Sequence, residues 1–319
     1  MAKFVAAVLF ICFLVCIILC LWNYYNRSFI SGVDKKFVLV TGCDSGFGRE
    51  TALTLDKLGF GVFATCLTKE GEESLKAVTS SRVFPLHLDV TDSHKIKAVY
   101  ARVKELLPPD CVLWGVVNNA GVARLGLIEW MPFDEFKQVA DVNLWGLIDV
   151  TKTFLPLVKK AEGRVVNFSS MLGQLSVPTS CAYCITKYGV EAFSDALRRE
   201  MSPWNVRVSI IEPGSFKTGL MDGNRAERIF RGHWESLSEE IREDYSEEYV
   251  ERLIKIFHKG LDMCSGHTYK VVNAVVDALM SNNPQTRYQV GLDSKLVTFM
   301  ALLPSSGPDM VLQRLSSLK

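Results

Sequence analysis

The feature that most constrains this chain is an alternation of short apolar segments with longer amphipathic ones. The apolar segments lack the every-second-residue pattern of a strand with one wet face, so both of their faces are expected to be covered. They are predicted as buried strands over 37–41, 61–66, 83–88, 113–117, 164–168, 206–211 and 288–291, with helices over 50–58, 93–107, 133–160, 182–201 and 269–280. The sequence therefore predicts an α/β fold with a doubly wound parallel sheet, whose ligands bind at the carboxyl ends of the strands.

The amino-terminal region, residues 1–25, is predicted to be a transmembrane anchor. Positions 4–22 form a run of 19 residues without a charge. As a helix this run would be about 28 Å long, close to the hydrocarbon thickness of a bilayer. The alternative is a cleaved signal peptide, whose apolar part usually spans only ~7–15 residues and ends in small residues. We expect a retained anchor followed by a globular domain over 36–319.

Two later regions depart from the alternation. Residues 219–264 are charged and aromatic, with helical periodicity, and follow the sixth predicted strand. They are predicted to be helices that form a lid over the carboxyl edge of the sheet. The tail over 296–303 is apolar again, and we expect it to pack in the core rather than against a membrane.

Charge and cysteine content argue against nucleic-acid binding, metal sites and a disulfide framework. The 36 basic and 35 acidic residues give a net charge of +1, which argues against a nucleic-acid-binding protein. Nine cysteines show neither metal-ligand spacing nor a disulfide framework, so no metal site is predicted and a reducing compartment fits.

A glycine-rich turn follows the first predicted strand and opens a helix. Its sequence, TGCDSGFG at 41–48, contains Gly42, Gly46 and Gly48. Glycines permit a tight turn and a close backbone approach to a phosphate, which the free amides of the helix then face. Such a turn alone is weak support, but its place after the first strand of an α/β pattern strengthens it.

A second group of polar residues is expected at the same edge of the sheet. Tyr183 and Lys187 are four residues apart and share one helix face, so the ammonium group should lower the pKa of the phenol toward neutrality. Ser170 ends the fifth strand, where its hydroxyl can bond a substrate oxygen while Tyr183 exchanges a proton. The segment 118–121 and Asn143 belong to this edge too. For each of these features in isolation, a surface pair, a turn or a cap is the simpler interpretation.

Together these residues resemble the short-chain dehydrogenase/reductase family, with its Rossmann fold. The matching motifs are TGxxxGxG at 41–48, NNAG at 118–121, Asn143, Ser170, YxxxK at 183–187 and Pro213-Gly214. The resemblance implies a catalytic Ser170, Tyr183 and Lys187, with Asn143 helping to hold a proton-relay water and Lys187 binding the nicotinamide ribose. It further implies cofactor contacts from Thr41, Gly42, Ser45, Gly46, Phe47, Gly48, Asp89, Asn118, Ala120, Gly121, Tyr183, Pro213, Gly214 and Thr218.

Within that family the chain is most similar to the retinol and hydroxysteroid dehydrogenase branch, which also contains D-β-hydroxybutyrate dehydrogenase. Where the mitochondrial hydroxybutyrate enzyme carries arginines, this chain has Gln174 and Ser180. Arg124, Lys217 and Arg225 are alternative cations for a carboxylate, although a solvated surface position is the simpler interpretation of each. We therefore expect a lipophilic alcohol such as a retinoid or a hydroxysteroid, with D-β-hydroxybutyrate as the alternative substrate.

Cofactor and location are inferred from the same regions. No acidic residue ends the second predicted strand, but Asp44 in the glycine turn would repel an added 2′-phosphate, so NAD is favoured and NADP is the alternative. The apolar amino terminus resembles the anchor of the microsomal retinol and steroid enzymes, which implies the endoplasmic reticulum membrane, with a mitochondrial membrane as the alternative. A non-catalytic cofactor-binding scaffold is disfavoured because no triad residue is missing. The resemblance also implies a possible homo-oligomer.

Overall fold

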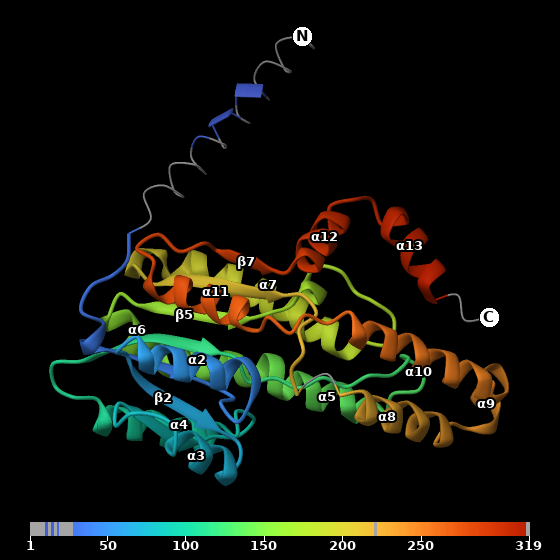
Figure 1. Ribbon diagram of the computed structural model, residues 1–319, viewed down its shortest axis with the longest axis horizontal. Coiled ribbons are helices and arrows are strands. Elements are labelled where there is room, and N and C mark those ends of the chain that lie inside the picture. Colours follow the sequence, from blue (N-terminus) through green and yellow to red (C-terminus); the bar gives the residue numbers. More distant parts are fainter. Residues whose placement is uncertain (1–9, 12–13, 16–17, 19–27, 220–221, 317–319) are drawn as a thin grey trace.

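A parallel sheet forms the centre of the molecule (Figure 1). The computed structural model describes residues 10–11, 14–15, 18, 28–219 and 222–316. The strand order is β3-β2-β1-β4-β5-β6-β7, and every neighbouring pair is parallel. The strands are β1 (Lys36–Val40), β2 (Gly61–Cys66), β3 (Val83–His87), β4 (Val112–Asn118), β5 (Arg164–Phe168), β6 (Arg207–Pro213) and β7 (Arg287–Val290). The predicted α/β fold with a parallel sheet is confirmed.

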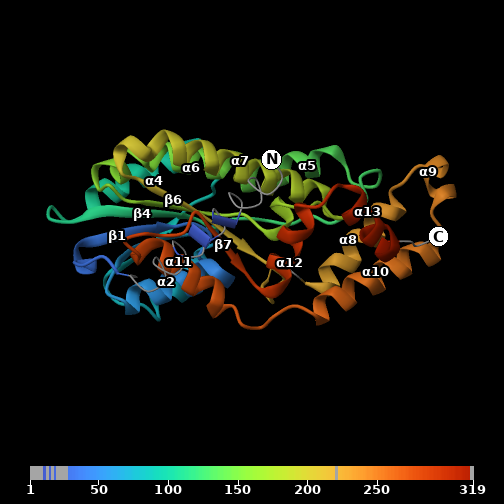
Figure 2. The same cartoon turned by 90° about the horizontal axis from the view of Figure 1, so that it is seen from above.

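Helices cover both faces of the sheet (Figure 2). Successive residues of β1 point to opposite faces because side chains alternate along a strand. Val38 and Val40 pack in one buried cluster, with side chains of α2 (Gly46–Lys57), α3 (Lys69–Lys76) and α11 (Tyr269–Met280). Phe37 and Leu39 pack in the other, with α4 (Ser93–Leu106), α6 (Leu147–Lys160) and α7 (Cys181–Met201). The largely apolar composition of the strands thus reflects a sheet whose two faces are both covered by helices.

The long helix predicted over 133–160 is divided. It consists of α5 (Phe133–Ala140), a π-helical turn at Asp141–Gly146 and then α6. A π turn accommodates an extra residue in the helix, and such turns frequently lie at functional sites. Asn143 lies within the turn and is almost fully buried. Short 3₁₀ segments elsewhere span Val33–Lys35, Met171–Gly173 and Ser202–Trp204.

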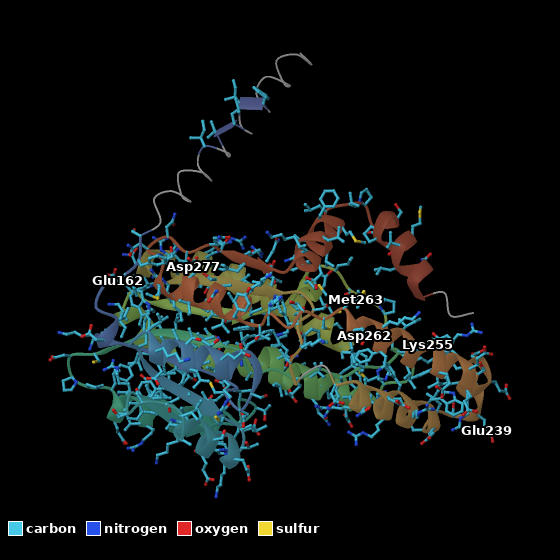
Figure 3. The ribbon with its side chains drawn as sticks, in the orientation of Figure 1. Glu162, Glu239, Lys255, Asp262, Met263 and Asp277 are labelled. Carbon is cyan, nitrogen blue, oxygen red and sulfur yellow. The ribbon has the colours of Figure 1, made fainter. Side chains whose placement is uncertain are left out.

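Three helices, which we call the upper helices, follow β6. They are α8 (Gly223–Glu235), α9 (Glu239–Asp244) and α10 (Glu247–Asp262). They form a small apolar core of their own, in which Phe230 and Leu253 pack with Trp130 from the segment after β4. Figure 3 shows Glu239 at their outer end and Met263 where α10 returns toward the sheet.

The chain ends in α12 (Leu292–Ala301) and α13 (Ser306–Ser316). Their apolar side chains face outward: Leu296 is 60% exposed, Phe299 61% and Leu302 79%. The prediction that 296–303 packs in the core was therefore wrong. The side of α12 that faces the protein carries Ser294 instead, which is fully buried and donates a hydrogen bond to the carbonyl oxygen of Glu212.

The predicted anchor over 1–25 lies outside the described residues except at isolated positions. Among the residues that the structure describes, no helix is long and apolar enough to cross a membrane.

Candidate active site

A cavity of about 740 Å³ opens at the carboxyl ends of the central strands. Its wall contains most of the residues predicted for the site, from motifs that are more than 150 residues apart at their extremes. They are Gly42, Ser45, Gly46, Phe47, Asp89, Ala120, Gly121, Ser170, Tyr183, Lys187, Pro213, Gly214 and Thr218. The parallel sheet explains this convergence, since the carboxyl ends of all its strands meet at one edge.

The glycine turn between β1 and α2 has a backbone that other residues cannot easily adopt. Gly42 and Gly46 have φ angles of 71° and 58°. A Cβ atom on Gly42 would lie 2.8 Å from the Cα of Ala120, and one on Gly48 would lie 2.2 Å from the carbonyl oxygen of Gly42. Ser45 precedes α2 without a side-chain cap, so the first amides of the helix are available toward the cavity. This cradle fits the pyrophosphate of a dinucleotide.

Three of the predicted site residues brace the cavity wall rather than line it. The hydroxyl of Thr41 accepts hydrogen bonds from the amides of Asn119 and Ala120, both at 3.0 Å. The side-chain amide of Asn118 donates to the Thr151 hydroxyl and to the side-chain oxygen of Asn167, both at 2.8 Å. Gly48 has no side chain, and a larger residue there would collide with the carbonyl oxygen of Gly42 in the glycine turn. These residues tie the loop after β4 to β1 and β5, which fixes the position of the cavity floor.

Asn143 also lies outside the cavity lining. Its Nδ2 donates to the carbonyl oxygen of Val122 at 2.8 Å, and its Oδ1 accepts from the amide of Val122 at the same distance. Nδ2 lies 3.2 Å from the hydroxyl of Thr186 as well, which belongs to the helix of Tyr183. The side chain therefore connects the loop after β4 to α7.

Ser170, Tyr183 and Lys187 come together in the cavity. Ser170 lies two residues after the end of β5, and its hydroxyl accepts a hydrogen bond from the backbone amide of Leu172 at 3.1 Å. Tyr183 lies in the first turn of α7. The Nζ of Lys187 donates to the carbonyl oxygen of Phe168 at 2.8 Å and lies 5.3 Å from the centre of the Tyr183 ring. The arrangement brings two hydroxyls and one ammonium group to the place where a substrate oxygen would bind.

Burial dominates the charge states of these groups. It raises the pKa of Tyr183 to about 12, although a hydrogen bond with the Ser170 side chain opposes the rise. It lowers the pKa of Lys187 to about 8, against the attraction of Glu191. The expectation that the ammonium group lowers the pKa of Tyr183 therefore fails in this structure. Nζ lies over the ring and bonds a carbonyl oxygen, so its charge does not offset the loss of water around the phenol.

Behind Lys187 lies a buried ionic cluster that sequence reasoning missed. Arg287 of β7 contacts Glu191 of α7 at 3.1 Å and Glu212 of β6 at 3.2 Å. Burial, together with the charge of Glu191, raises the pKa of Glu212 to about 7. Gln174 donates to Glu212 at 3.2 Å. No local motif contains these residues, since each comes from a different element.

Asp44, which the sequence analysis used to favour NAD, and Asn119, to which it gave no separate role, both belong to the site. The Asp44 carboxylate accepts hydrogen bonds from the amides of Leu67 and Thr68, both at 2.9 Å, at the end of β2. Asn119 donates to the carbonyl oxygens of Thr41 and Gly42. Both line the cavity. The acidic group missing from the end of β2 is thus supplied by the glycine turn.

The upper helices and α13 form the other side of the cavity. Their contribution is almost entirely apolar: Phe230, Tyr249, Leu253, Ile256, Phe257 and Leu312. Of the three cations considered for a carboxylate substrate, Arg225 lines the cavity, whereas Arg124 lies 4.0 Å from Glu135. The substrate side therefore suits a large apolar molecule with one polar end.

Comparisons with known proteins agree with this geometry. The family model described as short chain dehydrogenase matches residues 36–229. Retinol dehydrogenase 7 of Rattus norvegicus is 43% identical over 298 residues, which cover 92% of this chain and 93% of that protein. The 17-beta-hydroxysteroid dehydrogenase type 6 of Homo sapiens is 41% identical, covering 91% and 92%. The mitochondrial D-beta-hydroxybutyrate dehydrogenase of Rattus norvegicus is 43% identical, covering 82% and 80%.

The fold has solved relatives too. A short-chain dehydrogenase from Streptomyces avermitilis superposes with a TM-score of 0.69 at 27% identity, covering 88% of this chain and 98% of the other.

Proposed function

The chain belongs to the short-chain dehydrogenase family, as an NAD(P)-dependent enzyme that acts on CH–OH groups, and we propose that its substrate is a lipophilic alcohol such as a retinoid or a hydroxysteroid. One observation carries the proposal: a single cavity joins Ser170, Tyr183 and Lys187 to the apolar side chains of the upper helices. A hydrocarbon skeleton bound there is removed from water, which contributes about 25 cal/mol for each Å² of apolar surface buried. Its hydroxyl end would meet the polar group.

The dinucleotide fits the glycine cradle, and when bound it supplies the acceptor or donor of a hydride. The remaining chemistry falls to side chains of this protein. Tyr183 exchanges a proton with the substrate oxygen, which Ser170 holds by a hydrogen bond. With a pKa of about 12 the phenol is protonated at neutral pH, as the reduction of a carbonyl requires. Oxidation requires the phenolate, which burial disfavours in this structure.

We propose supporting roles for the other site residues. Asn143 keeps α7 in register with the loop after β4, and thereby sets the position of Tyr183 and of a proton-relay water. Asp89 bonds within its own loop at the cavity wall, where it would face the adenine. Thr218 lies beside Gly46, where it would contact the cofactor phosphates.

NAD is the cofactor that we propose. The Asp44 carboxylate lies at the end of β2, where the ribose 2′-hydroxyl is bound in this fold, and an added phosphate would meet its negative charge. Changing Asp44→Asn should raise the NADP:NAD ratio of kcat/KM. Asp56→Asn, which removes a loop-bracing carboxylate outside the cavity, is the control. An unchanged ratio in Asp44→Asn would remove Asp44 as the selecting residue.

We also propose that residues 1–25 anchor the enzyme in the endoplasmic reticulum membrane, with 36–319 as the catalytic domain and 219–264 as its substrate lid. The support is the uncharged run over 4–22 and the lipophilic substrate class. Alkaline extraction of membranes from cells that express the full chain tests the anchor. Co-fractionation with mitochondrial markers would exclude the assigned compartment.

The enzyme assay measures NADH formation by detergent-solubilised full chain. All-trans-retinol, an androgen-type hydroxysteroid and D-β-hydroxybutyrate are compared in parallel. We expect turnover of a lipophilic alcohol. Turnover of hydroxybutyrate alone would overturn the proposed substrate class and make Arg225, which lines the cavity, the first candidate for the carboxylate ligand. Absence of turnover with every alcohol, despite dinucleotide binding, would favour a non-catalytic scaffold.

A further inference from the structure

An apolar surface lies on α12, α13 and the turn between them, and we call it the terminal surface. Its exposed side chains are Leu292, Leu296, Phe299, Leu302, Leu303, Met310 and Val311. Leu292, Leu296, Phe299 and Leu303 are spaced by four, three and four residues, so they follow one face of α12 and its continuation. Single exposed apolar residues are ordinary on a protein surface, whereas a cluster of this kind marks a site of interaction.

The position of the terminal surface relates it to the apolar amino terminus. The continuous described part of the chain begins at Ser28, whose carbonyl oxygen accepts a hydrogen bond from the backbone amide of Asn282 at 2.9 Å. The amide of Ile30 donates to Met280 at 2.8 Å. This pairing precedes β7, and α12 follows β7 directly. β7 has four residues, so it is about 13 Å long.

The connection between the uncharged run and the described chain is short. The run ends at residue 22, six residues before Ser28, and six extended residues reach at most about 20 Å. A bilayer that holds the run must lie within that distance of Ser28. In Figure 1, α12 and α13 lie on the β7 side of the molecule, away from β2. Ser28, to which the run is connected, and the terminal surface thus both lie at the β7 edge of the sheet.

We infer that the terminal surface lies on the lipid bilayer and opens the cavity toward it, an inference that rests on the proposed anchor and substrate class. Within α13, Met310 and Val311 belong to the terminal surface while Leu312 lines the cavity. Ile256 of α10 also lines the cavity and is 45% exposed. An alcohol dissolved in the lipid would then pass from the bilayer to Tyr183 along apolar side chains. Lys295 lies beside the leucines, where its stem can cover lipid while the ammonium group reaches the headgroups.

The direct test places a tryptophan on the terminal surface. Full-length Phe299→Trp is reconstituted into phosphatidylcholine vesicles with brominated acyl chains, and the emission of the parent protein is subtracted. Val78→Trp, an equally exposed apolar position beside β3 at the opposite edge of the sheet, is the matched control. We expect bromine to quench most of the added emission at position 299 and little of it at 78. An equal fraction of quenched emission at the two positions would overturn the inference.

A second experiment separates the bilayer from another copy of the chain as the occupant. In Leu296→Glu/Phe299→Glu, KM for a vesicle-borne alcohol should rise several-fold while the dinucleotide KM stays unchanged. If the charges instead convert a dimer into a monomer in detergent and the tryptophan at 299 is unquenched, a second copy covers the surface and the inference fails. Because quenching needs no turnover, it still reports docking if the proposed substrate is wrong.

Discussion

The two sides of the cavity are built in different ways. The cofactor side consists largely of backbone: glycines with positive φ, uncapped helix amides and loops tied by Thr41 and Asn119. The substrate side consists of side chains from α8, α10 and α13, none of which is restricted by a special backbone conformation. A backbone site is sensitive to a single added methyl group, whereas a side-chain site changes its shape with each substitution. The chemistry can therefore stay constant while the substrate changes, as the differently named relatives of similar identity illustrate.

The largest effect is expected where the two sides meet. Tyr183→Phe removes the hydroxyl that exchanges the proton, and kcat should fall by about 10²–10⁴-fold. Dinucleotide binding, measured by fluorescence titration, should persist. Tyr188→Phe is the control, because Tyr188 lies on the same helix as Tyr183 but does not line the cavity, and its hydroxyl donates to the carbonyl oxygen of Gln174. Equal losses in the two variants would mean that the phenol of Tyr183 is structural.

The cofactor side should respond to one methyl group. Gly48→Ala places a Cβ 2.2 Å from the carbonyl oxygen of Gly42 and 2.4 Å from Nδ2 of Asn119. We expect a loss of about 1–3 kcal/mol in stability and weaker dinucleotide binding. Gly232→Ala is the control, since its Cβ would meet no atom within 4 Å; in a helix it should stabilise by up to about 1 kcal/mol. If both variants bind the dinucleotide equally, the contrast between the two sides is broken.

The ionic cluster behind Lys187 should give stability a pH dependence that neither side of the cavity shares. The carboxyl pKa of Glu212 is about 7 when folded, against an ordinary 4.5, so the folded state holds the proton more tightly. As pH rises from 4.5 through 7, the unfolded state ionises first and the native protein loses stability. Glu212→Gln removes this loss, and its stability relative to the parent should increase by about 1–3 kcal/mol over that window.

Thermal midpoints at pH 5 and pH 8 measure the change. Glu105→Gln, at an exposed position, should show the same difference from the parent at both values. A parallel shift in Glu212→Gln at both pH values would show that the carboxyl ionises normally.

The smallest effect is expected on the substrate side. Ile256→Ala removes part of the apolar wall, and KM for a lipophilic alcohol should rise by up to about tenfold, which corresponds to 1.4 kcal/mol. The dinucleotide Kd should not change. Ile128→Ala, at an exposed position outside the cavity, should leave both constants as they are. A change in the dinucleotide Kd would show that the two sides are not independent.

Sequence patterns predicted what depends on local chemistry. The strands are mostly apolar, and the predicted ends of each lie within two residues of the observed ones. The residues of the glycine turn and of Tyr183–Lys187 were found because spacing within one element carries them. Helix α3 was missed because its sequence, KEGEESLK, is charged and has one apolar anchor. The π-helical turn was missed because a continuous helical pattern does not reveal one extra residue.

Features that depend on distant partners could not be found in this way. The pKa of Tyr183 follows from burial and from where the Lys187 ammonium group lies, not from their separation of four residues. The outward face of α12 depends on which side of that helix packs on β6, as the contact from Ser294 shows. Asp44 reaches β2 only because the sheet brings the two loops together.

The ionic contact between β6, α7 and β7 has a consequence for synthesis on the ribosome. Glu191 and Glu212 both depend on Arg287, which emerges late, after every family motif has been translated. Loss of one partner of a buried ion pair costs about 3–5 kcal/mol. A nascent chain that already carries Ser170, Tyr183 and Lys187 therefore still lacks the cation of this cluster, and its native packing is completed only when the last strand is delivered.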